Sequence, residues 1–177
     1  MTRGMMDLTE LEDARDAFAA SIEGLDPGQW RFAPGPEQWS IAEIAAHVTL
    51  VSREIGLMIR GPLLRTPLDV DHAPSEAIVR RRLLSRDYKV KAPERFVPME
   101  IVATAEELQR EFLTHRGELL EWLRHTDAPL RSHRLPHPRL GSLDGVEWLA
   151  FLAAHELRHV AQIEDAKGAI GYPLTRR

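Results

Sequence analysis

The stretch WLAFLAAHELRHVAQI, residues 148–163, decides the fold, because it combines the longest uninterrupted helical pattern of the chain with two histidines. Histidines four residues apart on a helix lie on the same face and can bind a single metal ion. At roughly 100° per residue, one face of this helix groups Trp148, Leu152, His155, His159, Ile163 and, at its edge, Gln162. The stretch therefore predicts a helix that turns two imidazoles inward and supplies half of a metal site.

The composition bounds the chemistry of the chain. A length of 177 residues is enough to bury one core, so we predict a single domain over residues 1–177. The formal net charge of -4 gives no sign of the lysine and arginine excess that nucleic-acid binding requires. Because the chain contains no cysteine, any metal must be held by histidine, carboxylate or water.

The N-terminal residues are acidic and amphipathic and contain no long apolar run. This pattern favours neither a signal peptide nor a membrane span. We therefore expect a cytoplasmic protein with no membrane partner and no nucleic-acid partner.

Apolar residues recur at helical spacing in four long segments. Ser40 and Thr104 each precede a glutamate by three residues, which is the capping-box pattern of a helix start, and Ser142 is a suitable N-cap for the last helix. Four long helices with almost no strand pattern predict an all-α fold, a four-helix bundle. The predicted helices span residues 7–25, 40–60, 104–125 and 142–167.

One long crossover connection joins the second and third helices, and its course is not predicted. Prolines are scattered through residues 61–102, and only residues 75–85 show a short helical pattern. That pattern contains the basic run Arg80-Arg81-Arg82, which is typical of a solvated face but could also border a pocket for an acidic or thiol cofactor. The proline-rich and glycine-rich segment before Ser40 contains two tryptophans, so we expect an ordered loop.

A third inward histidine comes from the second helix. His47 taken alone would be a core histidine that makes one hydrogen bond, which is the commoner role of a histidine on an apolar face. In a bundle, however, facing helices can bring it to His155 and His159. Three neutral imidazoles would leave coordination positions open, as in reactive metal sites. The apolar face that carries His47 also contains Glu43, Ile44, Leu50, Val51, Glu54 and Met58.

The segment His155 to His159 also matches the H-E-x-x-H pattern of zinc peptidases, in which the glutamate is a general base. Such a peptidase needs a third ligand downstream, and no histidine follows His159. The carboxylates of Glu164 and Asp165 lie off the histidine face. The match therefore favours a peptidase less than a site completed from upstream.

Two motifs together resemble the DinB-like superfamily, which includes metal-dependent hydrolases of the YfiT type. They are WSIAEIAAH at residues 39–47 and HELRHVAQI at residues 155–163, and residues 138–149 resemble the family's entry into the last helix. The resemblance implies a cytoplasmic helical bundle, frequently a homodimer, with one divalent metal. It assigns as ligands His47, His155 and His159.

Histidine ligands favour zinc or nickel, with iron as a third option, over magnesium and calcium. Such a metal would act as a Lewis acid on a bound water or thiol. We therefore expect a metal-dependent hydrolase or thiol-dependent transferase that acts on a small molecule. The alternative is a non-catalytic, stress-associated protein that binds a metal or a small molecule.

Two carboxylates are candidates for catalysis. Glu54 is predicted to project inward two turns beyond His47, where it could act near the metal or substrate. Glu156 lies about 60° from His159 on the helical wheel, and it could either orient a metal-bound water or form a salt bridge inside the bundle. For Glu43 the capping box is favoured over a hydrogen bond to a ligand ring.

The remaining polar candidates are expected to be structural or exposed. Gln162 could form a hydrogen bond across helices. His115 lies on the apolar side of the third helix, where we expect a core histidine with one partner and not a fourth metal ligand. Exposure is expected for the histidines in loops and at helix ends, namely His72, His125, His133 and His137.

Overall fold

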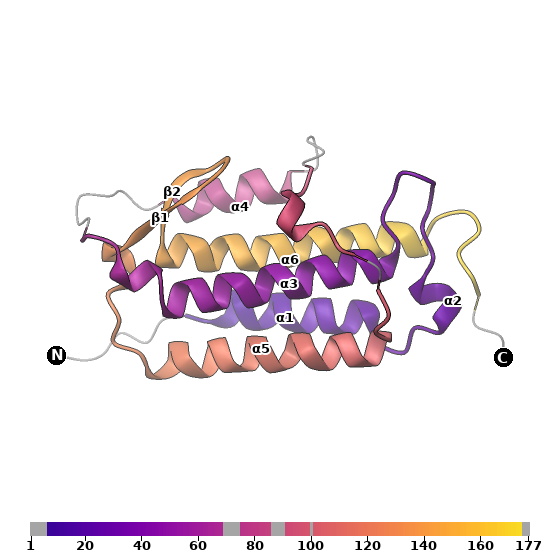
Figure 1. Ribbon diagram of the computed structural model, residues 1–177, viewed down its shortest axis with the longest axis horizontal. Coiled ribbons are helices and arrows are strands. Elements are labelled where there is room, and N and C mark those ends of the chain that lie inside the picture. The colour runs from indigo at the N-terminus through magenta and orange to yellow at the C-terminus, as the bar shows by residue number, and fades with distance from the viewer. Residues whose placement is uncertain (1–6, 69–74, 86–90, 100, 175–177) are drawn as a thin grey trace.

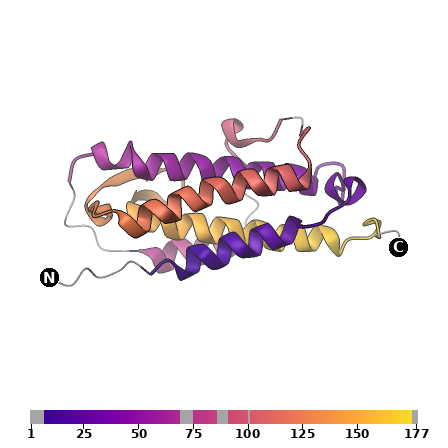
Figure 2. The same ribbon diagram turned by 90° about the horizontal axis from the view of Figure 1, so that it is seen from below.

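The computed structural model describes residues 7–68, 75–85, 91–99 and 101–174. Four long helices run along one axis in both views (Figure 1 and Figure 2). Each packs on two others, with α1 and α3 both contacting α5 and α6. The chain therefore forms the predicted four-helix bundle. Its helices are α1 (Thr9–Ile22), α3 (Ile41–Arg60), α5 (Ala105–His125) and α6 (Gly145–Lys167).

The second and third of these helices, α3 and α5, run in the same direction, from right to left in Figure 1. Their connection must therefore return along the whole length of the bundle, which explains why the crossover is long. It contains η1 (Leu63–Arg65), a helix α4 (Glu76–Leu84) that packs on α6, and η2 (Glu94–Phe96) beside α3. The helix predicted at residues 75–85 is α4.

Local hydrogen bonds fix two of the helix starts. The Oγ of Ser40 accepts from the backbone N–H of Glu43 at 3.3 Å, and the Glu43 carboxylate accepts from the Ser40 N–H at 2.7 Å. Thr104 and Glu107 form the same reciprocal pair at 3.2 and 2.8 Å. Both predicted capping boxes are confirmed, and each satisfies donors that a helix start would otherwise leave unpaired.

The start of the last helix differs from the prediction. Ser142 is not its N-cap but pairs with Pro136 in a two-stranded antiparallel sheet. Asp144 is the N-cap, and its Oδ1 accepts from the backbone N–H of Glu147 at 2.8 Å. The prediction was wrong because a capping box of the type Asp-x-x-Glu lies only two residues beyond the serine, where it competes for the same role.

This small sheet is an addition that the sequence pattern did not predict. Strands β1 (Arg134–His137) and β2 (Gly141–Asp144) form a hairpin beside the first turns of α6, preceded by η3 (Leu130–Ser132). Gly141 has a φ of +83°, a conformation that glycine adopts without steric cost. The loop before Ser40 is also ordered, and it contains a short helix α2 (Pro27–Trp30).

The apolar core is divided into two clusters along the bundle. Leu119 and Ala153 belong to one cluster, and Phe112 and Ile163 belong to the other. Between these levels lie large buried polar side chains, namely Arg116 on α5 and a group on α6 that consists of His155, Glu156 and His159. A polar layer therefore crosses the middle of the bundle. No helix in the described part of the chain is both long and apolar enough to cross a membrane.

Candidate metal centre

The three predicted histidines lie together in this polar layer. His47 projects from α3, and His155 and His159 project from successive turns of α6. Their ring centroids are 5.1, 5.0 and 4.5 Å apart for the pairs 47–155, 47–159 and 155–159. The exposed fractions of His47, His155 and His159 are only 5%, 8% and 9%. Two helices distant in sequence therefore supply three nearly buried imidazoles to one point.

The nitrogen atoms are spaced for a single ion. One ring nitrogen from each histidine lies within 4.8 Å of the others, and the Nε2 atoms of His47 and His155 are 3.2 Å apart. A tetrahedral zinc with bonds near 2.0–2.1 Å requires nitrogens roughly 3.3 Å apart. The His47–His155 pair already has this separation, so the donor set fits a divalent transition metal.

Two of the rings are held by acceptors on their outer nitrogen. The Nδ1 of His47 lies 2.7 Å from the carbonyl oxygen of Phe96, and the Nδ1 of His159 lies 2.8 Å from Oε1 of Gln162. Because carbonyl oxygens only accept, each Nδ1 must carry the proton and each Nε2 must present its lone pair. Such contacts orient metal-ligating histidines and raise their basicity.

His155 is held differently. Its Nδ1 is buried, and within the described ranges it has no hydrogen-bond partner. Its ring stacks on Phe151, with centroids 5.6 Å apart and planes 20° apart. Packing against Phe151, and not an acceptor on Nδ1, holds this ring on its outer side.

Burial also determines the charge of the three histidines. Desolvation lowers the pKa of His47, lowers that of His155 well below its ordinary value, and lowers that of His159 to about 3. Repulsion between the neighbouring rings acts in the same direction on His155 and His159. All three are therefore neutral at neutral pH, and neutral imidazole is the form that binds a metal.

The prediction that Glu54 projects inward was wrong. Its side chain is 48% exposed and lies beside Arg53, at 3.4 Å, instead of projecting inward. Glu54 follows His47 by seven residues and shares its direction on the helical wheel. At His47 the Phe96 carbonyl of η2 contacts the ring, whereas the Glu54 side chain two turns further along the helix is exposed to solvent. Glu43 forms the capping box described above, which is the role favoured for it.

Glu156 forms a salt bridge inside the bundle, one of the two alternatives that the sequence left open. Its Oε1 lies 3.2 Å from Nε of Arg116, and both side chains are 0% exposed. The guanidinium also donates from Nη2 to the Leu11 carbonyl at 3.0 Å, so α1 joins the network. Burial raises the pKa of Glu156, although Arg116 opposes the rise.

His115 does not lie in the core, and the expectation that it would was wrong. Its side chain is 29% exposed and faces Glu111, with 3.7 Å between Nε2 and Oε1. The neighbouring Arg116 takes the inward position. Charged residues are rarely buried unless they are paired. The sequence pattern therefore favours His115 inside the core and Arg116 on the surface.

The other histidines divide into exposed and buried positions. His125 is exposed, as expected. His133 is buried, and its Nδ1 lies 2.8 Å from the Thr66 carbonyl oxygen, so the expected exposure was wrong. His137 is half-buried, with its ring 4.8 Å from that of Phe151, because the unpredicted hairpin places it there. His72 lies outside the described residues.

Several residues around the histidines were not found from the sequence. Phe96 contacts His47 through its backbone carbonyl, and the residue type at a position does not indicate such a contact. Arg158 lies between the two histidines of α6 and donates to the carbonyl oxygens of Leu83 and Ser85 at 2.9 and 2.6 Å. In the basic run of α4, Arg81 is exposed, as predicted for a solvated face. Arg80 instead forms an ion pair with Glu10.

Comparison with known proteins identifies the family of this chain. The sequence of the chain matches the family model of the DinB superfamily over residues 10–163, a range that includes all three histidines. The chain belongs to the DinB superfamily. It is 25% identical over 150 residues to the uncharacterised protein YuaE of Bacillus subtilis (strain 168), a match that covers 84% of this chain and 90% of YuaE.

A solved structure confirms the architecture of this DinB superfamily member. TT2238, described as a four-helix bundle protein, superimposes with a TM-score of 0.55 at 24% identity. The match covers 89% of this chain and 95% of TT2238. At this identity the likeness supports the fold alone.

Proposed function

We propose that this DinB superfamily protein binds one divalent transition metal through His47, His155 and His159. The observation that carries the proposal is the convergence of three neutral imidazoles, two of which have their outer nitrogen fixed by an acceptor. Imidazole ligands favour zinc or nickel, with iron as a third option, and disfavour magnesium and calcium.

We further propose that the site is catalytic, as a metal-dependent hydrolase or a thiol-dependent transferase for a small molecule. Three protein ligands leave a coordination position for water, thiol or substrate, as in catalytic zinc sites. When bound, the metal would supply Lewis acidity that lowers the pKa of such a group. The Phe96 carbonyl and the Gln162 side chain would hold His47 and His159 in the ligating orientation. From the resemblance we also propose a homodimer.

A non-catalytic metal-binding role is the second candidate. The low exposure of the three rings favours it, because a buried ion could stabilise the bundle without meeting a substrate. The peptidase interpretation has weaker support. It needs Glu156 as a general base, and the Glu156 carboxylate is paired with Arg116.

Metal content and turnover, measured on protein purified without a polyhistidine tag, test the two roles. We expect one zinc or nickel per chain, and we expect hydrolysis or thiol transfer that chelation and His159→Ala both abolish. His125→Ala, which removes an exposed histidine, is the matched control and should retain metal and turnover. A metal ratio near zero after adding zinc and nickel would contradict the ligand assignment. Turnover that survives His159→Ala would contradict the catalytic role alone.

A further inference from the structure

We propose that metal binding is coupled to the docking of the crossover, so that a bound metal orders η2, which contacts His47, and the last turn of α4, which contacts Arg158. The inference rests on the proposed metal binding and goes beyond it, because it assigns a role to residues that are not ligands. Two contacts of the described crossover residues 75–85 and 91–99 lie at or next to the proposed ligands on α3 and α6.

The first contact is the hydrogen bond between His47 and η2. The Nδ1 of His47 donates to the carbonyl oxygen of Phe96 at 2.7 Å. Bonding of a ring to a metal polarises it, which strengthens the hydrogen bond made by its other N–H, and the acceptor in turn raises the basicity of the ligand. The backbone N–H groups of Phe96 and Val97 donate within the same turn, at 2.8 and 3.1 Å, so their exchange reports whether η2 is formed.

The second contact joins α6 to the end of α4. Arg158 immediately precedes His159 and donates from Nη1 to the carbonyl oxygens of Leu83 and Ser85. These carbonyls are at the C-terminal end of α4, where the helix leaves acceptors unpaired and its dipole is negative. The residue next to a proposed ligand on α6 therefore holds the end of α4.

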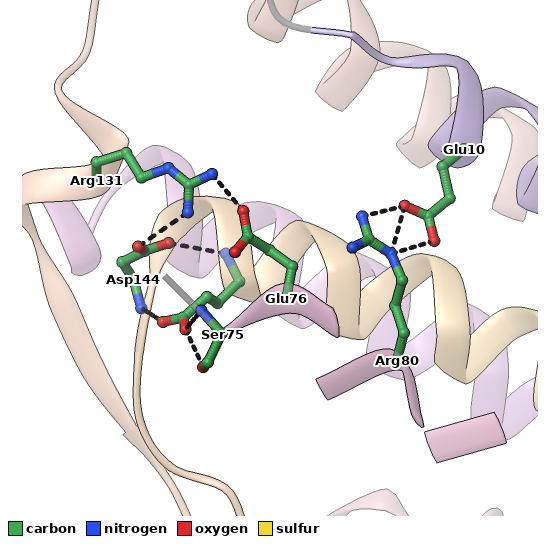
Figure 3. A network of polar contacts seen from close by, with 7 residues as sticks. Glu10, Ser75, Glu76, Arg80, Arg131 and Asp144 are labelled. Carbon is green, nitrogen blue, oxygen red and sulfur yellow. Dashed lines mark hydrogen bonds and ion pairs between the residues drawn. The ribbon is translucent and has the colours of Figure 1, made fainter. Parts of the chain in front are cut away.

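The opposite end of α4 is held by contacts that do not involve the histidines (Figure 3). The backbone N–H of Ser75 donates to Glu147 at 2.8 Å, and Arg131 pairs with both Glu76 and Asp144. Glu147 and His155 are eight residues apart on α6, which is roughly 12 Å.

A further contact reaches the first helix, where Arg80 makes an ion pair with Glu10. These contacts anchor the first half of α4 whether or not a metal is bound. The response to metal is therefore confined to the last turn of α4 and to η2, and the first turn of α4 serves as an internal control.

Hydrogen exchange followed by mass spectrometry tests the coupling on the full chain. The wild-type protein is compared after chelation and after addition of one equivalent of zinc, and metal content is measured on the same samples. We expect exchange at residues 94–97 and in the last turn of α4 to slow by at least about fivefold, the lower end of typical coupling between sites. Exchange at residues 76–79 should be unchanged.

The variant Arg158→Met separates the two contacts. It should remove the zinc-dependent protection of the last turn of α4 and leave that of residues 94–97 in place. Arg81→Met, an exposed arginine on α4, is the matched control and should behave as wild type. Stoichiometric zinc binding with unchanged exchange at residues 94–97 would overturn the inference and leave the metal site intact. Absence of zinc binding would overturn both proposals.

Discussion

Replacing Glu156 by alanine is expected to lower the free energy of unfolding by about 3–5 kcal/mol. The substitution would leave the guanidinium of Arg116, which is 0% exposed, without the carboxylate of its ion pair. Desolvation of an unpaired charge costs far more than the loss of a surface contact. Urea or guanidinium denaturation, followed by circular dichroism, measures the change.

Two comparisons make this prediction specific to the buried pair. Glu54→Ala removes an exposed carboxylate and should change the free energy of unfolding by no more than about 0.5 kcal/mol. The double variant Arg116→Met/Glu156→Leu should be less destabilised than Glu156→Ala, since it leaves no buried charge. If the Glu156→Ala protein is as stable as the Glu54→Ala protein, then Arg116 and Glu156 do not form a buried ion pair in solution.

Replacing His47 by alanine is expected to weaken zinc or nickel binding by more than about 100-fold, since the loss of an outer hydrogen-bond partner alone typically costs roughly 10–100-fold. His47 is the decisive position because it belongs to a different helix from the other two ligands. Competition with a chromophoric chelator gives the affinity.

Gln162→Leu provides an intermediate case. It removes the acceptor of the His159 Nδ1 and keeps all three ligands, so a loss of roughly 10–100-fold is expected. His125→Ala should bind as wild type does. Equal affinities for wild type and His47→Ala would reject a site that joins α3 to α6.

The parts of the molecule that sequence reasoning predicted depend on local signals. The capping boxes at Ser40 and Thr104 act within four residues, so their pattern identifies two helix starts directly. The spacing of His155 and His159 places them on one face for the same reason. The inclusion of His47 needed more, namely a bundle in which facing helices meet and the resemblance to the DinB family.

The parts that were missed depend on contacts distant in sequence. Nothing near Arg116 indicates that it is buried, because its partner Glu156 lies on another helix. The helical wheel shows that Glu54 and His47 project from the same side of their helix. It does not show which other segments of the chain contact each of them. The hairpin strands are four residues long, too short to establish an alternating pattern.

The proposed function depends on one divalent metal bound by three histidines from two helices. A crystal structure of protein loaded with zinc or nickel, with anomalous data collected at the absorption edge of that metal, tests it most directly. We expect a single anomalous peak bonded to the Nε2 atoms of His47, His155 and His159. A loaded protein with no peak at these rings, or with its peak at other residues, would contradict it.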